Sequence, residues 1–417
     1  MQLKSQRNGW DIEDSLVELG QLAWTAGLEV VGQTWQRLDR FHPATLVGSG
    51  KVEELNELRR DLDCDLVIFD DELSPRQLRN LEETLGEEIR VLDRTALILD
   101  IFAQHAQTRE GQLQVELAQY EYRLPRLTRA STHLARQAGG GAARGGAGGV
   151  GLRGPGETQL EVDRRDISRR IAQIKQDLEQ VRRHRQLHRR QRKRKAIPIV
   201  AIVGYTNAGK STLLNALSGS DILVEDMLFA TLDPTTRRVT LPGGLEVLFS
   251  DTVGFIQKLP TELVAAFRAT LEGINEADLI LHVVDITHPN VRQQSATVLE
   301  TLADLGVMDR PMVVALNKID LLSDPTDIDG RLDGDANSQA ISAREGIGLE
   351  ALLSRVEAIL LSDLVYLTVR VPYARGDLAA LFHQEGTMVR ESHDGQGTKL
   401  EGYLSRRWLE HFRSYLT

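Results

Sequence analysis

The segment GYTNAGKS, residues 204–211, constrains the fold of this chain more than any other part of the sequence. It fits the pattern G-x-x-x-x-G-K-[ST], follows the apolar run IPIVAIV (197–203) and precedes the helical pattern STLLNALSG (211–219). In that context, glycine-rich backbone amides wrap phosphate oxygens beside a helix amino terminus. Lys210 would reach the β- and γ-phosphates, and the Ser211 hydroxyl would ligate Mg²⁺. The phosphate contacts are expected from Gly204, Tyr205, Thr206, Asn207, Ala208, Gly209, Lys210, Ser211 and Thr212.

A second motif, DTVG at 251–254, begins about forty residues beyond the P-loop and closes the apolar strand pattern LEVLFS. An acid at this place holds Mg²⁺ through water, and the amide of the motif's glycine senses the γ-phosphate. We therefore expect Asp251 to be a water-mediated magnesium ligand. We expect Gly254 to be a catalytic backbone donor.

Between the two motifs, the stretch FATLDPTT at 229–236 supplies hydroxyl groups in a polar segment. A switch threonine in such a segment completes the Mg²⁺ shell when the γ-phosphate is present. We assign this role to Thr231, place Phe229 near the nucleotide, and keep Thr235 and Thr236 as alternatives. The predicted catalytic set is then Lys210, Thr231 and Gly254, and the predicted magnesium ligands are Ser211 and Thr231 directly and Asp251 through water.

The tetrapeptide NKID at 317–320 follows the strand pattern PMVVALN and indicates which base is bound. A carboxylate at Asp320 accepts hydrogen bonds from the N1–H and exocyclic amine of guanine, whereas adenine lacks this donor pair. The aliphatic stem of Lys318 would cover the base, and the segment AISAREG (340–346) would contact guanine O6 through its backbone. The sequence thus predicts GTP rather than ATP, with contacts from Asn317, Lys318, Asp320, Ser342, Ala343 and Arg344.

Phe255 follows the DTVG motif, at the position where Ras-type switches carry a glutamine that orients the attacking water. A phenyl ring cannot hydrogen-bond to that water. We therefore hypothesise slow intrinsic hydrolysis that a partner accelerates by ordering the site. The sequence names no arginine finger, although Arg237 and Arg238 lie close to the switch segment.

Residues 1–105 alternate short apolar runs with helical patterns, which predicts a small α/β domain with a largely parallel sheet. Its expected strands are LEVVGQTW, DLVIFD and IRVLD. Ser74 and Pro75 mark the start of a helix between the last two. The first ten residues, MQLKSQRNGW, offer no apolar run, so we expect no strand from them.

Residues 106–196 carry two narrow apolar stripes, each suited to pairing with one partner helix. The stripes are Leu113, Leu117, Tyr120 and Leu124, then Ile167, Ile171, Ile174, Leu178 and Val181. Between them, residues 139–156 contain ten glycines, with Arg144 and Arg153 as the only charges. Glycine at this density has no side chains to bury. The sequence predicts an antiparallel helical hairpin with a flexible, cationic loop at its tip.

Residues 197–361 return to apolar strands alternating with amphipathic helices. This pattern predicts a second, larger α/β domain, a P-loop nucleotide-binding domain with a mostly parallel sheet. Residues 362–417 mix short strands with a helix, which predicts a small carboxy-terminal α+β domain.

Charge is distributed unevenly along the chain. Residues 164–195 hold fourteen Lys/Arg against three Asp/Glu, a net charge of +11. Because the whole chain has a net charge of −10, the remaining residues carry −10 − 11 = −21. A basic block on an acidic body favours local binding to a phosphate backbone, although a solvated basic helix has the same composition. The candidate RNA-binding residues are Arg144, Arg153, Arg164, Arg165, Arg169 and Arg170.

Several other classes of protein are disfavoured. No apolar stretch is long enough to span a membrane, and the amino terminus lacks the features of a secretory signal. A single cysteine, Cys64, cannot form an internal disulfide, which favours a cytoplasmic protein without stable membrane insertion, leaving room for peripheral association. His184 and His188 lie one helical turn apart, but no carboxylate completes a zinc site.

The chain resembles the HflX family of translational GTPases over nearly its whole length. The resemblance rests on long stretches, among them DDELSPRQLRNLE, VLDRTALILDIFAQHA, REGQLQVELAQYEYRLPRL, GPGETQLEVDRR, GYTNAGKSTLLNAL, LFATLDPTTR and DTVGFIQKLP, together with NKID. It implies an amino-terminal α/β domain, a helical hairpin, the GTPase domain and a small carboxy-terminal domain.

The resemblance also implies binding to the large ribosomal subunit, splitting of stalled ribosomes, and GTP hydrolysis stimulated by that subunit. The glycine loop would then contact ribosomal RNA near the peptidyl-transferase region. A monomer that binds GTP, GDP and Mg²⁺ is expected. The alternative is a GTP-regulated RNA-binding or RNA-remodelling protein, or a ribosome-biogenesis factor, without splitting activity.

Overall fold

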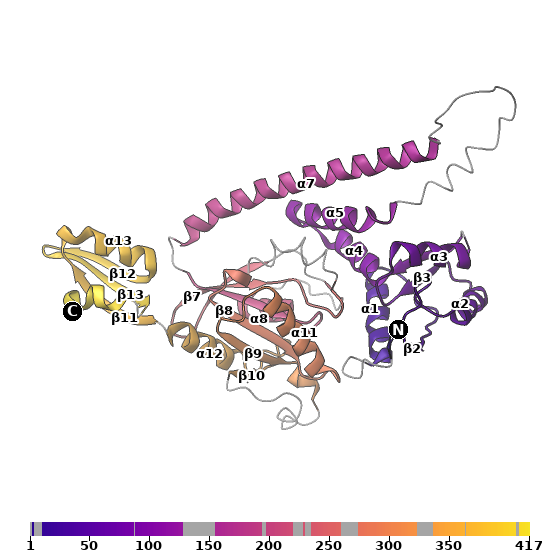
Figure 1. The fold of residues 1–417 in the computed structure, drawn as a ribbon. Helices are drawn as coiled ribbons and strands as arrows, with labels where there is room; N and C mark the ends of the chain where they lie inside the picture. The colour runs from indigo at the N-terminus through magenta and orange to yellow at the C-terminus, as the bar shows by residue number, and fades with distance from the viewer. Residues whose placement is uncertain are drawn as a thin grey trace. The chain divides into compact units, whose positions relative to one another are not determined.

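The computed structural model describes residues 2–3, 11–86, 88–127, 155–193, 197–219, 228–229, 235–259, 274–322, 337–362, 364–405 and 408–417 (Figure 1). The chain divides into two compact units. One comprises Met1–Val181 and Lys258–Phe267, and the other comprises Arg182–Gln257 and Arg268–Thr417. Lys258 is therefore grouped with the amino-terminal residues, whereas Phe255 and Gln257, which come directly after the DTVG motif, are grouped with the P-loop.

Short parallel strand pairs alternate with helices in the amino-terminal part. Its elements are β1 (Gln2–Leu3), α1 (Ile12–Thr25), β2 (Arg37–Leu38), α2 (Ser49–Asp61), β3 (Leu66–Phe69), α3 (Pro75–Leu85), β4 (Arg90–Asp93) and α4 (Arg94–His105). Strand β1 pairs with β2, and β3 pairs with β4, both in parallel. An apolar cluster that includes Phe69, Leu73, Leu81 and Val91 lies between the β3–β4 pair and helices α2 and α3. This part therefore has its own core.

Helix α3 begins where the sequence predicts. The Ser74 hydroxyl accepts a hydrogen bond from the Gln77 amide, the Gln77 side chain accepts one from the Ser74 amide, and Pro75 occupies the first turn. This capping box satisfies two amides that a helix start leaves without partners. The capping of this helix thus explains why Ser74, Pro75 and Gln77 occur at these positions.

Asp93 ties the end of β4 to the helices on either side of it. Its carboxylate is fully buried and accepts hydrogen bonds from the Leu73 amide at 2.9 Å, the Ala96 amide at 2.8 Å and the Tyr122 hydroxyl at 2.8 Å. Burial, together with the Asp93 charge, raises the pKa of the Tyr122 hydroxyl well above its usual value. Arg126 stacks on the same ring, with its guanidinium carbon 3.5 Å from the ring centroid.

Two expectations for the first sheet are wrong. Residues 28–35, predicted as the strand LEVVGQTW, form no strand, and Val30 and Trp35 within it are 51 % and 41 % exposed. β-Branched and aromatic residues favour strands only where a partner strand and a buried face are available. Conversely, Gln2–Leu3 does form a two-residue strand, although the sequence there is not apolar.

The two predicted apolar stripes meet. Helix α5 (Arg109–Arg123) and the long helix α7 (Pro155–Lys193) share one apolar cluster. Its members are Leu113, Leu117, Tyr120, Leu124, Ile167, Ile171, Ile174 and Leu178. Arg170 adds a two-pronged ion pair to Glu116 of α5 at 2.8 and 2.9 Å, and Lys175 pairs with Glu121 at 2.8 Å. The glycine loop at 139–156 lies outside the described residues except at its last two positions.

The predicted mostly parallel α/β sheet is confirmed. Six strands lie in the order β10-β9-β8-β5-β7-β6, and only the β6–β7 pair is antiparallel. Their bounds are β5 (Ile199–Gly204), β6 (Thr236–Thr240), β7 (Glu246–Asp251), β8 (Leu279–Asp285), β9 (Met312–Asn317) and β10 (Ser338–Ala340). The accompanying helices are α8 (Lys210–Ser218), α11 (Val291–Asp304), the short 3-10 helix η2 (Ile319–Leu321) and α12 (Leu349–Ser362).

The core of this sheet is a large cluster of apolar side chains. Residues such as Val200, Ile202, Val247, Phe249 and Leu281 are fully buried, and residues of α8 and α12 join the same cluster. Strand β5 lies in the middle of the sheet, between β7 and β8. Because parallel strands end at a common edge, the residues after β5, β7 and β9 gather there.

The last part of the chain is an antiparallel sheet with helices. Its strands are β11 (Leu364–Val371), β12 (Gly386–Asp394) and β13 (Gly397–Ser405), in the order β11-β13-β12. The helices are η4 (Tyr373–Arg375), α13 (Gly376–Glu385), α14 (Leu409–Phe412) and η6 (Arg413–Tyr415). Phe382 and Phe412 are fully buried and meet edge to face at 5.4 Å. The predicted mixture of strands and helices is present here.

Candidate nucleotide site

The P-loop backbone runs so close to its neighbours that two of its positions require glycine. A Cβ at Gly204 would lie 2.3 Å from the carbonyl oxygen of Val283, and one at Gly209 would lie 2.3 Å from Nδ2 of Asn317. Gly209 also has φ of +93°, a left-handed conformation that costs other residues about 1–2 kcal/mol. The spacing of the glycines in GYTNAGKS thus follows from packing as well as from phosphate binding.

Lys210, the first residue of α8, is buried at the base of this loop. Its ammonium group donates a hydrogen bond to the Tyr205 carbonyl oxygen at 2.8 Å. Burial lowers the pKa of Lys210 to about 8, and the charge of Lys318 acts in the same direction, while Asp251 opposes both. A desolvated cation beside a loop of amides is suited to bind the phosphates of a nucleotide.

The two described residues predicted to bind magnesium lie together. The Ser211 hydroxyl donates a hydrogen bond to the Asp251 carboxylate at 2.7 Å, although forty positions separate them in sequence. Asp251 is 1 % exposed, and its other oxygen accepts from the Thr252 amide at 2.9 Å. A hydroxyl and a carboxylate are the hard oxygen donors that Mg²⁺ prefers, so the residues present fit this ion.

Asn317 joins the P-loop to the predicted guanine loop. Its side chain donates to the Ala208 carbonyl oxygen at 2.8 Å and accepts from the Ala343 amide at 2.9 Å. Asn317 is 2 % exposed, and Ser342 beside Ala343 is fully buried. The first residue of NKID therefore fixes two separate loops, and the sequence-predicted base contacts Ser342 and Ala343 lie next to it.

Lys318, the lysine of NKID, forms an ion pair with a residue of the neighbouring strand β8. Lys318 Nζ lies 2.8 Å from the Asp285 carboxylate, at the carboxyl end of β8. Lys318 also has φ of +70°, which turns the chain sharply so that Asp320 follows on the exposed surface of η2. The arrangement leaves the Asp320 carboxylate accessible to a base.

Gly254 packs directly against the P-loop. A Cβ there would lie 2.8 Å from Thr206 Cγ2 and 3.0 Å from Lys210 Nζ. The next residue, Phe255, is 2 % exposed, and both its amide and its carbonyl group form hydrogen bonds with the P-loop. Its amide donates to the Gly204 carbonyl oxygen at 3.1 Å, and its own carbonyl oxygen accepts from the Thr206 amide at 2.8 Å. The phenyl ring is a core group here.

In comparison with known proteins, the sequence of this chain matches three family models in succession. Residues 13–103 match "GTP-binding GTPase N-terminal", residues 105–192 match "GTP-binding GTPase Middle Region", and residues 199–318 match "50S ribosome-binding GTPase". The chain is 45 % identical over 404 residues to the GTPase HflX of Caldanaerobacter subterraneus, covering 97 % of this chain and 90 % of that protein. It is 42 % identical over 392 residues to the GTPase HflX of Escherichia coli K12, covering 93 % and 88 %.

The chain belongs to the HflX family of GTPases. Among solved structures, it is similar to a GTP-binding protein of Sulfolobus solfataricus in complex with GDP. That protein is 24 % identical, with a TM-score of 0.43, and the match covers 87 % of this chain and 98 % of that one. The predicted family is confirmed by the sequence relatives, and with it the prediction that this chain hydrolyses GTP.

The structure of this HflX-family GTPase places most predicted site residues at one edge of the central sheet. Among these, Tyr205, Thr206 and Ala208 are buried, Asn207 is exposed, and Thr212 lies in the first turn of α8. Phe229 is 2 % exposed, with φ of +59°. Arg344 has an 80 % exposed side chain beside Glu345. Thr231 lies outside the described residues, so its role as the switch ligand stays a prediction.

The predicted RNA-binding residues divide into three groups. Arg164, Arg165 and Arg169 are exposed on α7, and Arg169 contacts Asp166 at 3.5 Å on the same helix. Arg170 is exposed as well, but its guanidinium is taken up by the ion pair with Glu116. Arg144 and Arg153 lie outside the described residues.

Three contacts of residues in or near the motifs were not foreseen from the sequence. Asp285 holds Lys318, the Tyr205 hydroxyl accepts a hydrogen bond from the Gln257 amide at 2.8 Å, and Lys258 forms ion pairs beyond the motif. The motif patterns contain no signal for these partners, because each contact joins residues that are far apart in the sequence. The run DTVGFIQKLP did mark Gln257 and Lys258 as part of a family-specific stretch.

No helix in the described part of the chain is both long and apolar enough to cross a membrane. Among the same residues, no cluster of three or more His, Cys, Asp or Glu side chains is arranged to hold a metal ion. His184 and His188 have no described side chains, so the rejection of a zinc site there stays a prediction.

Proposed function

We propose that this HflX-family GTPase binds the large ribosomal subunit and couples GTP binding and hydrolysis to the splitting or rescue of stalled ribosomes. The observation that carries the proposal is the match of residues 199–318 to the family "50S ribosome-binding GTPase". That range contains the P-loop, the DTVG motif and the first residues of NKID. The relatives named GTPase HflX, which align over nearly the whole chain, support the same assignment.

Each site residue has a part in this proposal that its surroundings support. The P-loop amides and Lys210 bind the phosphates, and Asp320 accepts from guanine while Asn317 keeps the loops in place. Ser211 and Asp251, with Thr231, would hold Mg²⁺, which neutralises charge on the phosphates when bound. Gly254 presents its amide to the γ-phosphate. Almost all of the rate acceleration in such a site comes from positioning and electrostatics.

Phe255 supports a dependence on a partner. Its ring is buried and its backbone is bonded to the P-loop, so it is not available to orient water. We infer slow intrinsic turnover that the large subunit stimulates.

Helix α7 supplies the proposed contact with ribosomal RNA. Arg164, Arg165 and Arg169 project from it into solvent, and α5 braces the helix through the shared apolar cluster. The loop at 139–156, with Arg144 and Arg153, would reach the RNA near the peptidyl-transferase region. In this proposal the domains are 1–105, 106–196, 197–361 and 362–417, and the protein works as a cytoplasmic monomer.

The first test is GTP and ATP turnover by the full chain, with and without isolated large ribosomal subunits. Small subunits serve as the matched control, and Lys210→Ala defines the contribution of this site. The proposal expects stimulation by large subunits only, confined to GTP and lost in the variant. Equal turnover with and without large subunits would refute the ribosomal part and leave the GTPase intact.

A second test separates splitting from RNA remodelling. Light scattering follows dissociation of intact ribosomes when the protein is added with GTP or with a non-hydrolysable analogue. A fall in scattering that requires the nucleotide supports splitting. Binding to ribosomes without any fall favours the alternative, a GTP-regulated RNA-binding protein.

The arginines of α7 have a test of their own. Substituting Arg164, Arg165 and Arg169 together by Ala should weaken ribosome binding most at low salt and flatten its salt dependence, because each phosphate contact that is lost no longer releases counterions. Ribosome binding with an unchanged salt dependence would remove these three residues from the proposed RNA contact.

A further inference from the structure

A buried ion network lies in the amino-terminal part, away from the motifs. Arg94, which is 1 % exposed, donates to Glu18 of α1 and to the Asp70 carboxylate at 2.7 Å. The Ser15 hydroxyl donates to the other oxygen of Asp70 at 2.7 Å. Burial alone would raise the pKa of Asp70, but the charges of Arg94 and Lys258 outweigh it and hold that pKa below its usual value. Asp70 is therefore a fixed negative charge.

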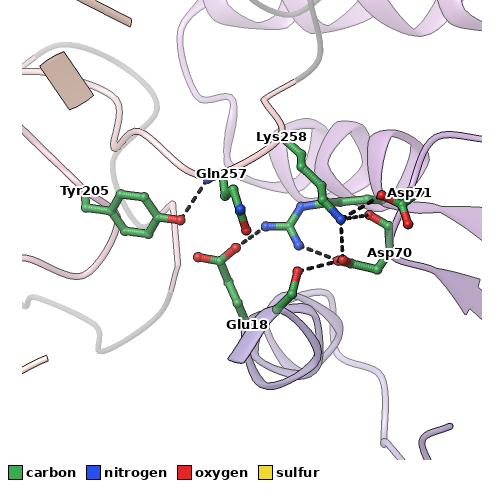
Figure 2. A network of polar contacts seen from close by, with 8 residues as sticks. Glu18, Asp70, Asp71, Tyr205, Gln257 and Lys258 are labelled. Carbon is green, nitrogen blue, oxygen red and sulfur yellow. Dashed lines mark hydrogen bonds and ion pairs between the residues drawn. The ribbon is translucent and has the colours of Figure 1, made fainter. Parts of the chain in front are cut away.

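Lys258 completes this network from outside the amino-terminal sequence (Figure 2). Its ammonium group lies 2.6 Å from Asp70 Oδ2 and 2.8 Å from Asp71 Oδ1, and it also donates to the Asp70 carbonyl oxygen at 3.3 Å. Lys258 belongs to the same compact unit as these acids, and its side chain is 33 % exposed. Its φ of +55° is uncommon for a residue with a side chain. Such a conformation persists where the surrounding contacts enforce it.

The residues just before Lys258 are held by the P-loop instead. Phe255 exchanges backbone hydrogen bonds with Gly204 and Thr206, and the Gln257 amide donates to the Tyr205 hydroxyl (Figure 2). The chain passes from one compact unit to the other between Gln257 and Lys258. The short segment after Gly254 is thus fixed by bonds at both of its ends.

We propose that Lys258 is a positioning residue for GTP hydrolysis, held by Asp70 and Asp71 so that the Gly254 amide is preorganised toward the γ-phosphate. The proposal rests on the proposed GTPase site. The lysine does not touch the nucleotide, and it acts through the intervening backbone, whose other contacts are with the P-loop. Preorganised donors cost no rearrangement when charge develops, so loosening one end of the segment should slow the chemical step rather than weaken ground-state binding.

The expected size follows from the exposure of the ion pair. Lys258 is partly exposed, but Asp70, one of its two acceptors, is buried, so Lys258→Ala should lower kcat about threefold to tenfold. KM should stay within about twofold, because ground-state binding is unchanged. Lys258→Arg should retain most of the activity, because a guanidinium can bridge both acids. Asp71→Asn removes one of the two charges and should lower kcat by about twofold to threefold.

The experiment measures intrinsic GTP turnover of the full chain for these three variants, together with thermal stability. Lys51→Ala is the matched control: Lys51 lies in the same unit and forms an ion pair of 2.6 Å with Glu54, but it is not attached to the DTVG segment. Its kcat should equal that of the wild type. An unchanged or increased kcat in Lys258→Ala would overturn the proposal. Absence of any GTP turnover in the wild-type protein would instead overturn the GTPase site on which the proposal rests.

Two further outcomes would also overturn it. If Lys258→Arg is as defective as Lys258→Ala, the positive charge is not what matters. Equal losses in Lys258→Ala and Lys51→Ala would assign the effect to general destabilisation. Should Lys258→Ala fail to fold, Asp71→Asn decides alone, since Asp70 and Arg94 keep their mutual ion pair in it.

Discussion

Asn317 offers the sharpest test of how the nucleotide site is assembled. Its side-chain amide bonds to the Ala208 carbonyl oxygen at 2.8 Å and to the Ala343 amide at 2.9 Å, and so fixes the P-loop and the predicted guanine loop at once. Both alanines are almost completely buried. In Asn317→Ala neither backbone group keeps its partner, and little solvent is available to replace it.

The magnitude follows from those two groups. Leaving a buried donor or acceptor unsatisfied costs about 1–3 kcal/mol, so with two such groups the closed site should lose about 2–6 kcal/mol relative to an opened one. The lower bound corresponds to a weakening of GDP affinity of about 30-fold, provided that the nucleotide binds only the closed site and that the site opens readily without it. Asn317→Asp keeps the acceptor for the Ala343 amide but places a carboxylate oxygen against the Ala208 carbonyl, so it should also bind GDP poorly.

Fluorescence titration with a labelled GDP measures these affinities. Asn80→Ala is the matched control, because its side chain also donates to an alanine carbonyl oxygen, that of Ala44 at 2.9 Å, but in the amino-terminal part. It should leave GDP affinity unchanged. If Asn317→Ala remains folded and binds GDP within about threefold of the wild type, the reasoning about the two loops is refuted.

Three further predictions concern stability. In the folded chain the pKa of Lys210 is about 8 against an ordinary value of 10.5, so the unfolded chain binds more protons between these pH values. The free energy of unfolding of the wild type, relative to that of Lys210→Met, should therefore rise between pH 8 and pH 10.5, by up to about 3 kcal/mol. Urea titrations measure this difference, and a difference that does not change with pH would contradict the prediction. Arg94→Met leaves two buried carboxylates without their guanidinium and should cost about 3–5 kcal/mol by chemical denaturation; a loss below about 1 kcal/mol would show that the acids are hydrated. Tyr122→Phe removes one of three donors to Asp93 and should cost about 1–2 kcal/mol, measured in the same way, and no loss would mean that water replaces the hydroxyl.

The sequence allowed the nucleotide site to be predicted because its chemistry restricts residue types within short segments. A left-handed backbone and the close approach of the Asn317 side chain favour glycine at 209. A hydroxyl at 211 and an acid at 251 are the oxygen donors that the proposed Mg²⁺ would need, and such requirements leave readable spacings. The apolar stripes of α5 and α7 were predictable for a similar reason, because burial along one helix face repeats every three or four residues.

Other features could not be predicted from sequence. Lys258 lies 188 positions from Asp70, and a lone lysine beyond a motif carries no mark of its partner. The segment 28–35 has the residue types of a strand, yet whether a strand forms depends on a neighbour that local sequence does not specify. Both cases are decided by tertiary contacts between residues that are distant in the chain.

The buried carboxylate of Asp93 has a consequence for how the amino-terminal part can be dissected. Two family models meet between residues 103 and 105, which suggests a convenient place to cut the chain. A fragment that ended there would lack Tyr122, and the fully buried acid would lose the hydroxyl that α5 supplies. The smallest autonomous fragment should therefore extend through α5, and backbone amides of α4 and α5 should exchange with deuterium in a single cooperative opening.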